Sequence, residues 1–171
     1  MDTFDAALLL LRLGVGLTFA AHGAQKIFGW WGGPGLEGWR GAMAKMGFRP
    51  AGLFAGLSGL IELAGGLFVA FGLVTPLAAA ALIAQSVVII GQVHWQNGFF
   101  NGKGGYEFPL SLGLGSIVIV LLGAGAWSLG ALFGFGLGPN LRAGLVVIGI
   151  LGGLAAMAVP RFGTNRPAPQ G

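Results

Sequence analysis

The sequence predicts an all-α fold, a polytopic transmembrane helical bundle. Only 14 of the 171 residues are charged, or 8%, whereas soluble domains carry about 25%. Two long stretches, residues 63–102 and 108–141, contain no charged residue at all, and about 20 apolar residues are enough to span a bilayer. These stretches lack the alternation of polar and apolar residues found in barrel strands, so helices must satisfy the backbone in lipid.

We expect one domain over residues 1–160, made of five membrane-spanning helices. The spans are predicted at about residues 6–28, 51–73, 77–95, 107–123 and 141–159. Thr75-Pro76 marks a tight turn before the third span, and Pro160 is expected to close the fifth. The polar tail, residues 161–171, is expected to be disordered.

The segments between the spans have features of their own. Apolar residues recur at helical spacing over residues 36–46, which predicts a short helix at the membrane interface. The glycine-rich connection at residues 124–139 is expected at the opposite interface. Gly52 and Gly56 form a small-xxx-small pair of the kind that lets membrane helices approach closely.

The distribution of basic residues predicts an orientation. With five spans, seven basic residues fall on one side of the membrane: Lys26, Arg40, Lys45, Arg49, Lys103, Arg161 and Arg166. The positive-inside rule then places the N-terminus outside and the C-terminus in the cytoplasm of a bacterial-type inner membrane. Because these residues are scattered, we interpret the net charge of +4 as a topology signal rather than as a sign of nucleic-acid binding.

Arg12 and Glu62 are the charges that lie deepest in the predicted spans. An ionisable group at that depth costs several kcal/mol unless it has a partner, so we expect the two to form a pair. Such a pair could simply lock two helices together. Alternatively, Glu62 could exchange protons, with Arg12 beside it.

Polar residues also gather at the predicted cytoplasmic ends of the spans. His22 and Lys26 are one helical turn apart, and His94 is expected at a similar depth on the third span. The expected binding residues are His22, Gln25, Lys26, Gln85, Gln92, His94 and Asn97, with Arg12, Glu62 and Glu107 as candidates for proton transfer. An inward-facing polar cluster ringed by aromatic residues suits an aromatic headgroup with a lipid tail. The alternative is that these side chains only snorkel or link helices.

Cofactor chemistry is restricted by the residue types present. The chain has no cysteine, which excludes thiolate metal sites and persulfide chemistry on this chain itself. Two histidines at equal depth could hold a haem b, but both rings would have to face one cavity, and we disfavour it. We expect no metal site, because Glu62 lies deeper than the histidines. A quinone is the cofactor we favour.

Three segments together resemble the DoxX family of small integral membrane proteins. They are LLLRLGVGLTFAAHGAQKIFG, GLIELAGGLFVAFGLVTPLAA and VHWQNGFFNGKGGYEFPL, and they follow one another in the family's order. The resemblance implies a four-helix membrane bundle, to which the region from about Leu141 adds a fifth helix. It also implies that seven residues occupy the family's polar positions: Arg12, His22, Lys26, Glu62, His94, Asn97 and Glu107. Members of the family include a subunit associated with thiosulfate:quinone oxidoreductase and proteins linked to quinone, catechol and oxidative stress.

We therefore expect an inner-membrane component of a quinone-linked redox or oxidative-stress system. No intrinsic redox group is evident, so electrons would come from a soluble redox or sulfur-handling partner, and whether the chain itself is an oxidoreductase subunit stays open. The alternative is a non-catalytic scaffold or accessory subunit of a larger membrane complex, docking through Arg40 and Lys45. A small-solute transporter ranks last, because no inverted repeat is detectable. The oligomeric state also stays open.

Overall fold

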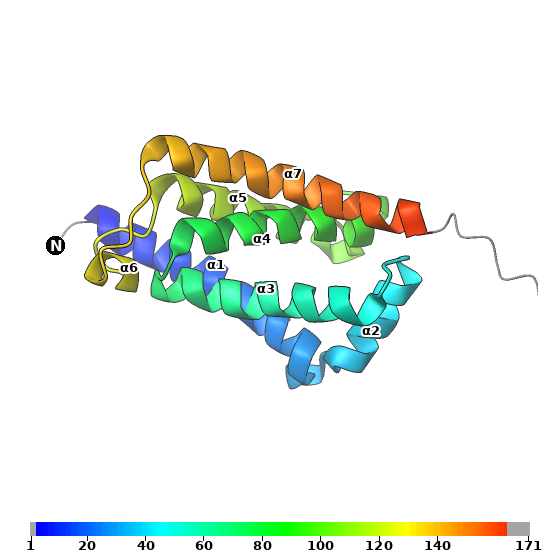
Figure 1. Cartoon of the computed structure of the whole chain (residues 1–171). Helices are drawn as coiled ribbons and strands as arrows, with labels where there is room; N and C mark the ends of the chain where they lie inside the picture. The colour runs from blue at the N-terminus through cyan, green and yellow to red at the C-terminus, as the bar shows by residue number, and fades with distance from the viewer. Residues whose placement is uncertain (1–2, 164–171) are drawn as a thin grey trace, which may run out of the picture.

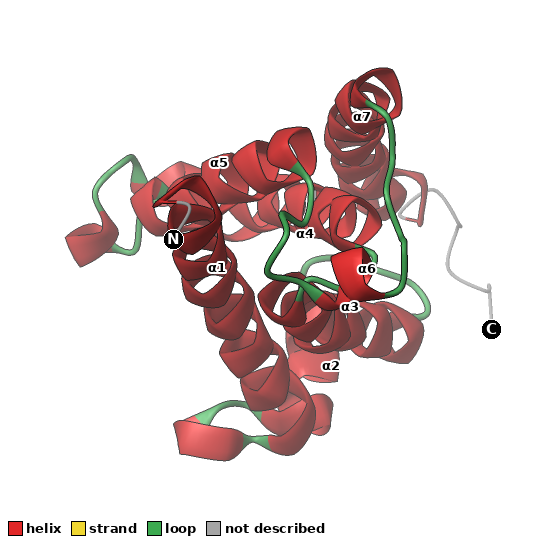
Figure 2. Cartoon of the chain, turned by 90° about the vertical axis from the view of Figure 1, so that its left-hand side faces the viewer, coloured by secondary structure: helices red, strands yellow, loops and turns green. Residues whose placement is uncertain are grey.

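The computed structural model describes residues 3–163, and the side chains of residues 3–160. The described part is helical and contains no strand, so the all-α prediction is confirmed. Its elements are α1 (Thr3–Phe28), α2 (Gly35–Lys45), α3 (Ala51–Phe71), α4 (Thr75–Ile89), α5 (Glu107–Leu122), α6 (Leu129–Leu132) and α7 (Pro139–Gly163). The five long helices run side by side (Figure 1), and α4 lies at the centre when the bundle is viewed end-on (Figure 2).

Each predicted span coincides with a helix. Four helical segments are long and apolar enough to cross a membrane: α1, α3, α4 with its continuation to Asn97, and α7 up to Pro160. The helix α5 has 16 residues, which is about 24 Å at 1.5 Å per residue and shorter than a hydrocarbon core of about 30 Å.

The prediction that Pro160 closes the last helix is wrong. The helix α7 includes Pro160 and continues to Gly163, because a proline loses only its own N–H bond while the residues after it still donate theirs. Residues 161–163 of the predicted tail are therefore helical. The remainder of that tail, residues 164–171, lies outside the described residues.

The helices α1 and α3 are antiparallel and touch along a seam of glycines. A Cβ atom added at Gly66 would come within 2.5 Å of the Gly16 carbonyl oxygen, and one added at Gly59 would meet the Ile27 side chain. A Cβ atom at Gly23 would collide with the backbone of Leu63. The predicted pair of Gly52 and Gly56 does not make this contact: Gly56 has open space around it, and Gly52 faces only the Arg40 side chain.

The amphipathic helix predicted over residues 36–46 is confirmed as α2. It packs on the beginning of α3 through a small apolar cluster of Met43, Phe48 and Ala55. This cluster is separate from the main core, which centres on α4 and includes Leu82 and Ile83. In Figure 1, α2, the start of α3 and the end of α7 all lie at the end of the bundle opposite the N-terminus.

The connection between α5 and α7 closes the other end. It crosses the ends of the long helices and carries the short helix α6 (Figure 2). The Gly130 N–H donates to the Gly72 carbonyl at 2.8 Å, and the Ala126 N–H donates to Asp5 Oδ1 at 2.9 Å. We call residues 123–138 the connecting cap.

Candidate functional site

The deep carboxylate of the bundle is paired with a lysine. Lys26 Nζ lies 2.5 Å from Glu62 Oε1, so the prediction of an Arg12–Glu62 pair is wrong. The Glu62 side chain is 1% exposed and that of Lys26 is 12% exposed. The ion pair therefore joins α1 to α3 inside the bundle.

Side-chain direction explains the choice of partner. Side chains on a helix lean toward its N-terminus. On the antiparallel helices α1 and α3, this directs Lys26 and Glu62 toward each other and directs Arg12 away from Glu62. The contacts of Gly16 with Gly66 also place Arg12 level with about residue 70, roughly 12 Å along α3 from Glu62.

Arg12 has partners of its own at the opposite end of α1. Its two terminal nitrogens donate to the carbonyl oxygens of Ala124 and Trp127, each at 2.5 Å. Both carbonyls belong to the connecting cap, and Arg12 is 1% exposed. Arg12 therefore fastens the cap to α1 and does not reach the polar cluster of the other end.

A hydrogen-bonded hub surrounds the ion pair. Gln85 donates to Ser58 Oγ at 2.7 Å and to Glu62 Oε1 at 3.1 Å, and Lys26 also reaches Ser58 Oγ at 3.4 Å. The Lys26 ammonium lies 4.3 Å from the centre of the Trp39 ring. Glu62 Oε2, however, is buried and has no hydrogen-bond partner among the described residues.

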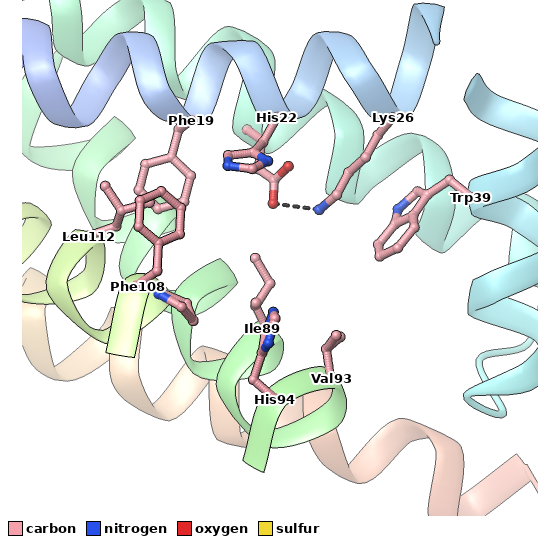
Figure 3. A pocket seen from close by; sticks show the side chains of 11 residues that line it. Phe19, His22, Lys26, Trp39, Ile89, Val93, His94, Phe108 and Leu112 are labelled. Carbon is pink, nitrogen blue, oxygen red and sulfur yellow. Dashed lines mark hydrogen bonds and ion pairs between the residues drawn. The ribbon is translucent and has the colours of Figure 1, made fainter. Parts of the chain in front are cut away.

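A cavity of about 210 Å³ lies beside this hub. Its walls come from α1, α2, α3, α5 and the end of α4 (Figure 3). The lining residues are Phe19, His22, Lys26, Trp39, Glu62, Ile89, Val93, His94, Phe108, Pro109 and Leu112. Figure 1 shows why space is left here: α1 crosses the other helices obliquely, so its C-terminal half moves away from α4 and α5.

The two histidines lie on opposite walls of the cavity (Figure 3). His22 packs on Phe108 with ring centres 5.8 Å apart, and among the described residues it has no hydrogen bond. His94 Nδ1 lies 2.6 Å from the Gly104 carbonyl oxygen. Because a carbonyl only accepts, Nδ1 carries the hydrogen, and Nε2 of the neutral ring is left as an acceptor.

A π-helical turn at residues Ile90–His94 sets the position of His94. The widened turn interrupts the regular 3.6-residue period of the helix, and Gln92 lies within it. Gln85, in the regular part of α4, donates to Glu62, whereas Gln92, within the π-helical turn, donates to the Met157 carbonyl of α7 at 3.1 Å. Turns of this kind occur frequently at functional sites.

Three further predicted residues lie outside the cavity. Gln25 lines a surface hollow with Trp31 and His22, and His22 is the residue that this hollow shares with the cavity. Asn97 donates to the Gly104 carbonyl at 3.1 Å, and Glu107 accepts from the Asn101 N–H at 3.0 Å. Asn97 and Glu107 thus stabilise the loop between α4 and α5. Of the ten predicted residues, the cavity brings together His22, Lys26, Glu62 and His94, with Gln85 directly behind Glu62.

Sequence reasoning missed two residues of the hub, Ser58 and Trp39. Ser58 is one helical turn before Glu62, so its place on the same face of α3 could have been found from spacing. Trp39 belongs to the predicted amphipathic helix, but only the packing of α2 on α3 brings it over Lys26.

The site combines an aromatic and aliphatic wall with one buried ion pair and two histidines. It can enclose an aromatic ring, offer hydrogen-bond acceptors to it, and exchange protons between a ligand, Glu62 and Lys26. A lining that is mostly apolar and carries a few polar groups is typical of small-molecule pockets.

Comparison with known proteins gives two matches. The sequence model of the DoxX family matches residues 7–95. An uncharacterized membrane protein of Mycobacterium tuberculosis is 32% identical over 133 residues, which cover 72% of this chain and 78% of that protein. No solved structure matches. The matched family segment contains His22, Lys26, Glu62 and His94, and so most of the polar lining of the cavity.

Proposed function

This chain belongs to the DoxX family of membrane proteins, and we propose that it is a quinone-linked component of a membrane redox system that binds a quinone headgroup in the α1–α5 cavity. The observation that carries the proposal is the free Glu62 Oε2. A buried carboxylate oxygen without a partner is costly, and Glu62 is one of the residues that line the cavity.

The cavity suits one substituted ring. A cavity of about 150 Å³ lined by Leu, Ile and Phe is enough to bind benzene, and this one measures about 210 Å³. Phe19 and Phe108 supply aromatic surface for stacking. The half-exposed Val93 and Phe108 lie where an isoprenoid tail would leave the ring for the lipid.

Protons and electrons have different sources in this proposal. Reduction of a quinone to a quinol takes two electrons and two protons. The Lys26–Glu62 pair and the histidines are groups that can exchange the protons. The electrons come from an external redox protein in this proposal. The sequence contains no cysteine, so the chain has no dithiol that could supply them.

The test is an inventory of quinones in protein extracted with its native lipids. Wild type should retain quinone at a level well above that of the surrounding lipid. His22→Ala combined with Glu62→Gln should lose most of it. Gln25→Ala is the matched control, because Gln25 is on the same helix as His22 but outside the cavity. Wild type without bound quinone, or equal retention by all variants, overturns the proposal.

A docking role for α2 is a second candidate. Arg40, Lys45 and Arg49 are exposed, and Arg40 and Arg49 border a surface hollow of about 580 Å³. An acidic soluble protein would suit this basic face. Reversing Arg40 and Lys45 to Glu should then abolish cross-linking to the partner and leave quinone retention unchanged. Unchanged cross-linking together with a loss of quinone retention rejects the docking role.

A further inference from the structure

Two residues that line the cavity carry acceptor atoms that make no hydrogen bond within the described chain. Glu62 Oε2 has no partner among the described residues and is buried. His94 Nε2 is an acceptor because the Gly104 carbonyl fixes the hydrogen on Nδ1. Both residues line the cavity, on different walls.

Donors are fewer. Lys26 directs its ammonium to Glu62, Ser58 and the Trp39 ring, so its N–H groups are already engaged. The Trp39 indole N–H is buried and lacks a partner within the described chain. His22 makes no hydrogen bond to the described residues and, as a neutral ring, can serve as either donor or acceptor.

The two redox states of a quinone meet this arrangement differently. The oxidised ring carries carbonyl oxygens, which only accept, so it leaves Glu62 Oε2 and His94 Nε2 unsatisfied. The reduced ring carries hydroxyl groups, which donate to these two acceptors and can still accept from Trp39 or His22. Hydrogen bonds to a carboxylate are among the stronger ones, and a buried acceptor that stays unpaired carries its full desolvation cost.

We infer that this cavity selects the reduced, hydroxyl-bearing form of its ligand over the oxidised quinone. The inference rests on the proposed function and deepens it by naming the preferred redox state. By the thermodynamic cycle, tenfold tighter binding of the quinol raises the midpoint potential of the bound two-electron couple by about 30 mV.

The experiment measures binding of three ligands to the full-length protein in nanodiscs by anaerobic calorimetry. The ligands are a decyl-substituted benzoquinone, its quinol, and the dimethyl ether of that quinol, which has the ring but no hydroxyl hydrogen. The quinol should bind more tightly than the quinone, by about tenfold or more. The dimethyl ether should bind no more tightly than the quinone.

Glu62→Gln tests the carboxylate directly. The amide replaces one acceptor by a donor, so the preference for quinol should fall to about twofold or less. Glu107→Gln is the matched control, because this carboxylate lies outside the cavity and the preference should persist. If Glu62→Gln does not fold, the three-ligand comparison on wild type still decides the question.

Each other outcome has a distinct meaning. Equal affinity for quinone and quinol, or a dimethyl ether as tight as the quinol, overturns the selection of the reduced form and leaves the proposed function standing. An unchanged preference in Glu62→Gln also overturns it. If none of the three ligands binds, the proposed function fails and the inference fails with it.

Discussion

The two ends of α1 bury charge in different ways. At one end, Arg12 binds two backbone carbonyls of the connecting cap and lines no cavity among those described. At the other end, Lys26 and Glu62 form an ion pair, both residues line a cavity, and the second carboxylate oxygen of Glu62 has no partner in the described chain. Each charge leaves one buried polar atom without a partner in the described chain, Arg12 Nε and Glu62 Oε2, but only Glu62 lines a described cavity. The first arrangement is suited to holding structure, and the second to holding a ligand.

Arg12→Met is expected to have the largest effect, and it tests whether Arg12 has a structural role. The variant loses two charge-assisted hydrogen bonds in a buried setting, so its free energy of unfolding should fall by about 3–5 kcal/mol. Thermal unfolding followed by circular dichroism in detergent measures the loss. Arg40→Met is the control and should change stability by less than about 0.5 kcal/mol, because Arg40 is exposed.

The quinol affinity of Arg12→Met tests whether Arg12 also belongs to the ligand site. At a temperature where Arg12→Met is folded, its affinity for quinol should stay within about twofold of wild type. A tenfold loss of affinity in the folded variant would show that Arg12 belongs to the site, contrary to the geometry.

A double-mutant cycle tests the ion pair. Lys26→Met and Glu62→Met each leave a buried charge without its partner and should each destabilise the protein by about 3 kcal/mol. The double variant should recover a good part of that loss, since a buried pair can often be replaced by apolar groups of similar volume. Glu62→Met and the double variant, which both lack the carboxylate, should lose quinol affinity at least tenfold. Additive stability losses would contradict the pairing, and a double variant that binds normally would contradict the role of Glu62 in the site.

The glycine seam sets the distance between α1 and α3 and can be tested separately. Gly66→Ala places a methyl group against the Gly16 carbonyl, so the stability should drop by about 1–3 kcal/mol. Gly56→Ala on the same helix meets open space and should be neutral or slightly stabilising. Equal melting temperatures for the two variants would argue against the close crossing of α1 and α3.

Trp39→Leu should have the smallest effect. It removes the ring that faces Lys26, which is worth about 1 kcal/mol, and it removes one donor from the cavity. The expected result is a decrease of about three- to fivefold in ligand affinity and a loss of about 1 kcal/mol in stability. Trp31→Leu, an exposed tryptophan outside the cavity, should bind as wild type does; a similar loss there would assign the effect to the interface rather than to the cavity.

Helix positions were predictable because long apolar runs have few alternatives in lipid. The helices α1 and α3 therefore appear close to their predicted places. Pairing across helices was harder. Arg12 was matched to Glu62 by depth alone, whereas the lean of side chains toward the helix N-terminus favours Lys26. Because that rule needs only the antiparallel arrangement of α1 and α3, the sequence pattern is sufficient to favour the Lys26–Glu62 pair.

Other features depend on packing that spacing does not reveal. Gln92 is among the binding residues that the sequence predicts, but it lies in the π-helical turn and donates to a carbonyl of α7. The carbonyls that bind Arg12 belong to a connecting cap more than a hundred residues away in sequence. A glycine-rich segment has many accessible conformations, so its carbonyl directions follow from tertiary contacts.

The most direct test of the central claim is photolabelling of the full-length chain in native-like lipid with an azido-benzoquinone. Labels located by mass spectrometry should concentrate on the cavity walls, at peptides containing His22 and Phe108, and unlabelled quinol should compete. Leu112→Trp, which fills the cavity, should abolish the labelling, whereas Leu114→Trp on the exposed face of α5 should not. Labels spread over the lipid-facing side of α7, without competition by quinol, would contradict a quinone site between α1 and α5.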